Sequence, residues 1–143
     1  MPFLQKNEYR EYFMERFGIP WEILEKYIFL ERGRKIWAFS GKYLEIGDIE
    51  LIGIKALTKG RVLKPSTAFL RIVGKRASKN VIRLNYKEML LFMKGEDIEK
   101  SFPVEPGYVI VVWEEDVLGC GFYKNGVLKS QIPSKYRMQD SWI

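Results

Sequence analysis

The single cysteine of the chain, Cys120, has a side chain that could do chemistry, since a thiolate can act as a nucleophile. It lies between Gly119 and Gly121 in an apolar stretch, and no basic residue beside it in the sequence would lower its pKa. We therefore interpret Cys120 as a small buried thiol. Gly119-x-Gly121 is not followed by a helical pattern, which makes it a poor phosphate-binding loop.

A run of three acids, Glu114-Glu115-Asp116, could supply carboxylate ligands to a metal ion. Consecutive acids in a predicted hairpin turn are usually solvated, so the sequence favours a surface turn over a metal site. The chain has no histidine, which is the commonest general base and metal ligand. We therefore expect no catalytic residue, no metal and no cofactor, and the sequence predicts a protein that is not an enzyme.

Basic residues form the clearest pattern. Positions 55–94 hold eleven lysines and arginines and one acid, Glu88, so this stretch carries a net charge of +10. The remaining residues carry −4, from thirteen basic and seventeen acidic side chains. A second basic group lies near the C-terminus and comprises Lys124, Lys129, Lys135 and Arg137. Evenly mixed lysines would indicate a solvated surface, but a segregated block with a pI near 9.4 favours binding of phosphate polyanions.

The elements that must position these groups follow from local patterns. Asn85 and Glu88 have the spacing of a capping box and predict a helix over residues 86–94. Gly95 is suited to end this helix because glycine accepts a positive φ. Apolar residues at helical spacing predict the buried stripe, which consists of Tyr86, Met89, Leu90 and Met93.

Strands are predicted on both sides of this helix. A short strand over 80–84 precedes it, and the runs 109–113 and 117–123 follow it around the acidic turn. Asn125-Gly126 is a strong hairpin signal that leads into a last strand. This part of the chain is therefore predicted to be a strand, a helix and an antiparallel meander.

The first half reads as a separate α+β unit. We expect a helix over 5–17 that ends at Gly18, and a short turn that starts with Pro20 at a first helical position. Further strands are predicted over 27–31, 35–40, 49–57 and 67–73, with Lys59-Gly60-Arg61 and Lys64-Pro65 in a loop. The sequence predicts an α+β fold with a domain over 1–74 and a second over 75–143, packed together because no long linker separates them.

The run from 80 to 126 resembles a PUA domain, a small pseudo-barrel that binds RNA. The likeness lies in three motifs: Lys94-Gly95-x-x-Ile98 after the helix, Gly107-Tyr108 at the start of an apolar strand, and Val117-Leu118-Gly119-x-Gly121 on the returning strand. The resemblance implies that the last two glycines let strands or RNA backbone approach closely.

The whole arrangement is similar to two groups of proteins. Residues 34–40, 49–56 and 69–84 suggest the small PUA proteins that assist assembly of the large ribosomal subunit. Residues 125–137 look close to the RNA-binding region of Sun/Fmu-type RNA cytosine methyltransferases. Those enzymes also carry a Rossmann-type cofactor domain too large for this chain and a Pro-Cys catalytic motif that is absent here, so their catalysis does not transfer.

RNA contacts are predicted partly from this resemblance and partly from helical geometry and the basic connector before residue 80. Tyr123 or Tyr136 is predicted either to stack on an unpaired base or, equally, to belong to the core. The full predicted RNA-binding set is Lys75, Arg76, Lys79, Lys87, Lys94, Gly95, Tyr123, Lys129, Lys135 and Arg137.

These features predict a cytoplasmic RNA-binding protein that holds rRNA or tRNA and acts as an accessory factor in ribosome assembly or RNA modification. The alternative is a scaffold whose aromatic-rich N-terminal domain binds a protein partner. No run of about 18 apolar residues and no secretory signal is present, so no membrane is expected. Sparse cysteine, histidine and amide residues beside abundant lysine and glutamate indicate a thermophilic source.

Overall fold

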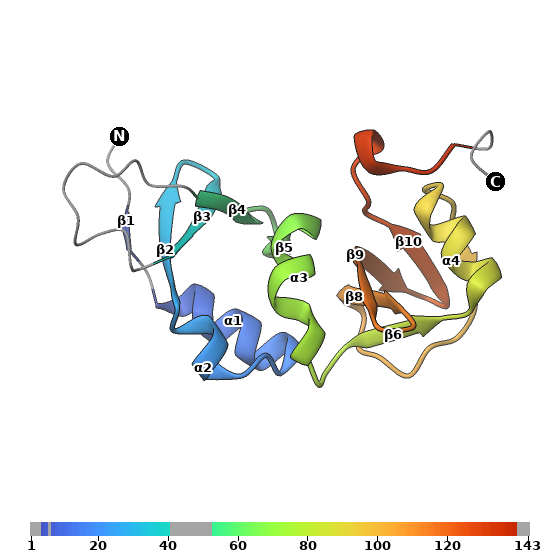
Figure 1. Cartoon of the computed structure of the whole chain (residues 1–143), viewed down its shortest axis with the longest axis horizontal. Coiled ribbons are helices and arrows are strands. Elements are labelled where there is room, and N and C mark those ends of the chain that lie inside the picture. The colour runs from blue at the N-terminus through green and yellow to red at the C-terminus, as the bar shows by residue number, and fades with distance from the viewer. Residues whose placement is uncertain (1–3, 6, 41–52, 140–143) are drawn as a thin grey trace.

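A computed structural model describes residues 4–5, 7–40 and 53–139. Two five-stranded sheets lie side by side, and helix α3 (Thr67–Val73) stands between them (Figure 1). The first sheet is antiparallel and its strands follow chain order. They are β1 (Leu4–Gln5), β2 (Tyr27–Arg32), β3 (Lys35–Ser40), β4 (Gly53–Thr58) and β5 (Lys64–Pro65).

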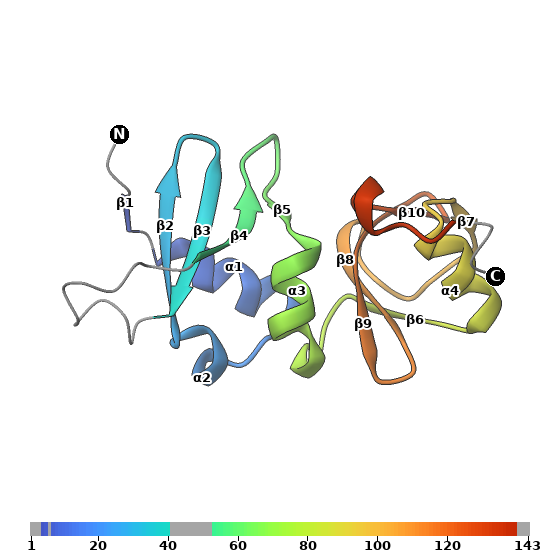
Figure 2. The ribbon, with the colours of Figure 1, turned by 45° about the horizontal axis from the view of Figure 1, so that its top comes forward.

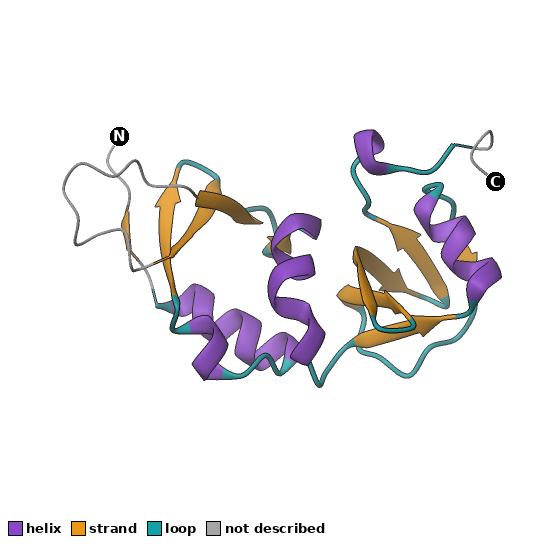
Figure 3. Ribbon diagram, viewed as in Figure 1, coloured by secondary structure: helices purple, strands orange, loops and turns teal. Residues whose placement is uncertain are grey.

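Three helices lie beside the first sheet, α1 (Glu8–Phe17), α2 (Trp21–Leu24) and α3 (Figure 3). Aromatic side chains join the sheet to α1 and α3. Phe13 of α1 is fully buried, and its ring centroid lies 5.9 Å from that of Phe29 in β2 and 5.1 Å from that of Phe69 in α3. The predicted helix ends as expected at Gly18, whose φ is +64°. Pro20 caps α2 rather than occupying its first helical position.

The strand predicted over 67–73 is wrong, because these residues form α3. Ser66 caps this helix by accepting a hydrogen bond from the Phe69 amide at 3.0 Å. The run of branched and aromatic residues suggested a strand, but Phe69, Leu70 and Val73 are buried by packing around the helix.

Lys64-Pro65, predicted as loop, pairs with β4 as β5. The first part of the predicted strand 49–57 lies outside the described residues.

The second sheet has the order β6-β8-β9-β10-β7. Strand β6 runs parallel to β8 and connects to it through α4 (Tyr86–Met93), whereas the other pairs are antiparallel. The predicted strand, helix and meander are therefore confirmed. The bounds are β6 (Val81–Leu84), β7 (Ile98–Glu99), β8 (Gly107–Trp113), β9 (Asp116–Lys124) and β10 (Val127–Ser130).

Both halves of the predicted capping box of α4 form: the Asn85 side chain accepts from the Glu88 amide at 2.9 Å, and the Asn85 amide donates to Glu88 at 3.0 Å. Gly95 has the expected positive φ, +88°. The predicted stripe is only partly right. Tyr86 is 57% exposed and packs beside Trp113, while Phe92 takes a fully buried place against the second sheet.

One hydrophobic core crosses between the two sheets. Ile110, Val112 and Cys120 of the second sheet pack in the same cluster as the aromatic side chains of α1 and α3.

The domain boundary predicted between residues 74 and 75 lies within the 3-10 turn η2 (Gly74–Arg76) and stays a prediction. In Figure 2, as in Figure 1, α3 lies between β5 and β8. No helix in the described ranges is long and apolar enough to span a membrane.

Candidate nucleic-acid interface

The predicted basic connector lies on the surface but is partly occupied by internal contacts. Lys75, Arg76 and Lys79 are exposed. Arg76 forms an ion pair with Glu22 at 2.7 Å, and Lys79 Nζ lies 3.4 Å from the Glu15 carbonyl oxygen. Two of these three side chains therefore also hold the connector against the N-terminal helices.

The structure brings together the predicted residues at the end of α4. Arg137 lies against Gly95, because a Cβ atom on this glycine would fall 2.7 Å from Arg137 Nε. The same Nε donates to the Ile132 carbonyl at 3.0 Å, and the Met138 amide donates to the Met93 carbonyl at 2.8 Å. The C-terminal segment is thus anchored alongside α4. Lys87 is exposed on this helix, and Lys94 is half-buried at its end.

Tyr123 belongs to the core, and its predicted stacking role is wrong. Its side chain is 7% exposed, its hydroxyl accepts from the Phe102 amide at 3.0 Å, and its ring packs edge-on against Phe102. An inward position in β9 explains this, because alternate side chains of a strand face opposite sides of a sheet. Lys129 of β10 is exposed, and its contact with RNA stays a prediction.

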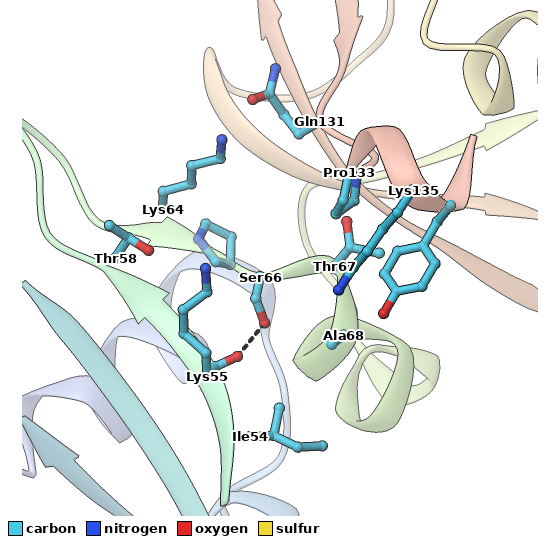
Figure 4. Close-up of a pocket in the computed structure, with 12 residues that line it drawn as sticks. Ile54, Lys55, Thr58, Lys64, Ser66, Thr67, Ala68, Gln131, Pro133 and Lys135 are labelled. Atoms are coloured by element: carbon cyan, nitrogen blue, oxygen red, sulfur yellow. Dashed lines mark hydrogen bonds between the residues drawn. The ribbon is translucent and has the colours of Figure 1, made fainter.

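Lys135 lies in the 3-10 turn η3 (Ser134–Tyr136), which follows β10. This turn borders a cleft of about 530 Å³, the other wall of which comes from β4, β5 and the start of α3 (Figure 4). Residues far apart in the sequence therefore meet across the junction of the two sheets. The lining residues are Ile54, Lys55, Thr58, Lys64, Pro65, Ser66, Thr67, Ala68, Gln131, Pro133, Lys135 and Tyr136.

The cleft is basic. Lys55, Lys64 and Lys135 contribute three exposed ammonium groups, and none of the described lining residues is an aspartate or glutamate. In the described ranges, none of these three lysines forms an ion pair with a carboxylate. Cations without a carboxylate partner give a local positive potential that favours an anionic ligand. The hydroxyl group of Thr58 adds hydrogen-bonding capacity to the same walls.

Ser66 fixes the wall that carries Lys55 and Lys64. Its hydroxyl donates to the Lys55 carbonyl at 2.5 Å while accepting from the Phe69 amide, and its backbone amide donates to the Ala56 carbonyl at 2.9 Å. One serine therefore links β4 to the first turn of α3, and the adjacent β5 strand places Lys64 beside them. Figure 4 marks the bond between Ser66 and the Lys55 carbonyl with a dashed line.

Contacts between α3 and β9 join the first wall to the second sheet. The Thr67 hydroxyl accepts from the Cys120 amide at 3.1 Å, and Arg71 Nε donates to the Leu118 carbonyl at 2.8 Å. Gly119 has φ +151°, and a Cβ atom there would fall 2.6 Å from Thr67 Cγ2. The Gly119-x-Gly121 motif thus permits close packing of α3 and of neighbouring side chains, rather than an approach of RNA backbone at these two positions.

Cys120 is a core residue, as predicted. Its side chain is 1% exposed, and burial raises the pKa of its thiol to about 12. The charge of Lys64 opposes this rise in pKa but is the smaller effect. A thiol with this pKa is protonated near neutral pH and is a poor nucleophile.

Lys55 and Lys64 were not among the predicted contact residues, although both belong to the +10 stretch. Their only sequence signal was that net charge, because nothing local shows that a turn about 70 residues later completes the cleft. Of the predicted set, the structure brings Lys135 to this cleft and brings Arg137 to Gly95, while Lys75, Lys87 and Lys129 lie on other elements.

Two family models match parts of the chain. Residues 79–138 match the model described as the methyltransferase RsmF PUA domain, and residues 4–53 match a family of unknown function, DUF7122. No curated protein matches the chain. The curled second sheet with its strand, helix and meander fits a PUA-like pseudo-barrel. From residue 79 to 138, the chain is therefore a PUA domain that resembles those of Sun/Fmu-type RNA methyltransferases.

Proposed function

We propose that this protein binds structured RNA, either rRNA or tRNA, as a non-catalytic accessory factor in RNA modification or ribosome assembly. The observation that carries the proposal is the match of residues 79–138 to the PUA domain of a methyltransferase. The cleft supports it, because three lysines that have no carboxylate partner among the described residues line its walls together with an exposed tyrosine. A non-catalytic role agrees with the buried state of the Cys120 thiol.

The scaffold alternative stays a hypothesis, but it receives no support from the aromatic side chains of α1. Tyr9, Phe13 and Phe17 are buried at 0–2% exposure. They serve the core of the first sheet.

Fluorescence anisotropy with a labelled RNA hairpin tests the proposal. If about five phosphates are contacted, log affinity falls against log salt concentration with a slope near −4, measured between about 50 and 200 mM salt. An acidic polypeptide such as polyglutamate, added as competitor, separates recognition of RNA from general charge attraction. Absence of RNA binding at low salt would contradict the proposed function.

A further inference from the structure

We infer that the cleft between the two sheets receives a single unpaired nucleotide of the bound RNA, with its base stacked on Tyr136. This inference rests on the proposed function and adds a ligand and a site to it. The site lies across the edge of the matched PUA region: Gln131 to Tyr136 are inside residues 79–138, whereas Ile54 to Ala68 are outside both matched segments.

The size of the cleft favours one nucleotide. Its volume of about 530 Å³ lies within the range of sites that hold one small molecule, roughly 300–1000 Å³. A double helix, in contrast, presents its phosphates along a surface and keeps its base faces stacked inside. A base can enter this cleft only where the strand is unpaired, at a loop, a bulge or an end.

Tyr136 offers the base a platform. Its side chain is 45% exposed, unlike that of Tyr123, and the backbone bond from its amide to the Pro133 carbonyl at 2.8 Å fixes the turn that carries it. Arg71 and Lys135 place their cationic groups 5.8 and 5.0 Å from the centre of the ring. Aromatic rings and guanidinium groups are the surfaces on which proteins stack splayed RNA bases.

The remaining groups match the other parts of a nucleotide. Lys55, Lys64 and Lys135 supply positive charge for the phosphates on either side of the base. The Gln131 side chain lines the cleft (Figure 4). An amide has donors and an acceptor, so it can read a base edge. The cleft therefore combines cationic side chains, an aromatic ring for stacking and an amide that can hydrogen-bond to a base edge.

Two RNA hairpins with the same stem test the inference, one blunt and one with a short single-stranded overhang that contains the fluorescent base 2-aminopurine. We expect the overhang to raise affinity about tenfold, within the range for one base stacked on an aromatic ring. The 2-aminopurine fluorescence should fall on binding. Y136A should abolish both effects and Y136F should keep them. The matched control is Y86A, since Tyr86 is an exposed tyrosine of α4 outside the cleft.

Equal affinity for the two hairpins, or an unchanged preference in Y136A, would overturn the inference and leave the proposed function standing. Failure to bind either hairpin would instead contradict the proposed function. A free nucleoside monophosphate should compete only weakly, because it lacks the flanking phosphate. Competition by this nucleotide at the concentration at which the overhang RNA binds would show a site for free nucleotides, and would also overturn the inference.

Discussion

At the scale of single residues, the buried Cys120 thiol gives a direct test of the packing between α3 and β9. Burial raises its pKa to about 12, so the reactive thiolate is scarce in the folded protein even at pH 9. We expect a thiol-specific chromogenic reagent to react slowly with the native protein from pH 7 to pH 9 and rapidly in denaturant. Fast native reaction that accelerates from pH 7 to pH 9 would show an accessible thiol with an ordinary pKa.

Two tyrosines show what residue-level prediction could and could not achieve. Tyr123 and Tyr136 were equal candidates for stacking on a base and for a place in the core. Tyr123 is buried because its side chain lies on the face of β9 that packs into the core. Tyr136 lies in η3, and its side chain is exposed. Lys135 was found from the sequence by resemblance, but Lys55 and Lys64 needed the tertiary fold, since they meet Lys135 only across the cleft.

At the scale of elements, α3 depends on a cap that the sequence prediction overlooked. S66A removes the bond from the Phe69 amide and the bond to the Lys55 carbonyl. We expect it to lower the free energy of unfolding by about 1–2 kcal/mol, as for other N-cap losses. Urea unfolding measures this. The control is S101A, at an exposed loop serine, which should change the value by less than about 0.5 kcal/mol.

The contact between α3 and β9 should be sensitive to one added methyl group. G119A combines an unfavourable φ with a Cβ atom 2.6 Å from Thr67, whereas G33A has a positive φ of +61° and no atom within 4 Å. We expect G33A to cost about 1–2 kcal/mol of stability from the backbone alone. G119A should cost a further 1–3 kcal/mol or so from overpacking. Equal losses in urea unfolding would mean that the contact is loose.

Elements with strong local signals were predictable. The α4 capping box, Gly95 and the Asn125-Gly126 turn all form as predicted, and both turn residues have positive φ, +52° and +75°. For α3 the local signals conflicted, because branched residues favour strands while Ser66 favours a helix start. Residues 67–73 form a helix because their side chains pack against both sheets. The local sequence pattern does not show these tertiary contacts.

At the scale of the whole molecule, Arg16 fixes the two sheets relative to each other. Its guanidinium donates to the Tyr108 carbonyl at 2.8 and 3.0 Å and to the Glu105 and Pro106 carbonyls at 3.2 Å each. We expect R16A to lower stability by about 2–4 kcal/mol, because hydrogen bonds from a charged donor are lost at a half-buried site. The matched control is R61A, which replaces an exposed arginine in a loop.

The shared core predicts that R16A unfolds in one transition, like the wild type, since residues of both sheets pack in a single cluster. Two separate transitions in circular dichroism and tryptophan fluorescence would show that the sheets fold independently. Sequence patterns predicted the order of the elements in the second half except for the short strand β7, whereas in the first half they missed α3 and β5. They did not reveal Arg16, whose partners lie about 90 residues away.

We propose that RNA phosphates bind the lysines of the cleft. The most direct measurement is the salt dependence of RNA affinity for two variants with the same loss of charge. The cleft variant is K55Q/K64Q/K135Q, and the control variant is K26Q/K35Q/K124Q, which replaces three exposed lysines that do not line the cleft.

The slope of log affinity against log salt should become less steep by about 3 in the cleft variant, and its affinity should fall about 100-fold at physiological salt. The control variant should keep a slope close to that of the wild type. If the two variants lose slope and affinity equally, RNA responds only to the net charge of the protein, and the cleft is not its binding site.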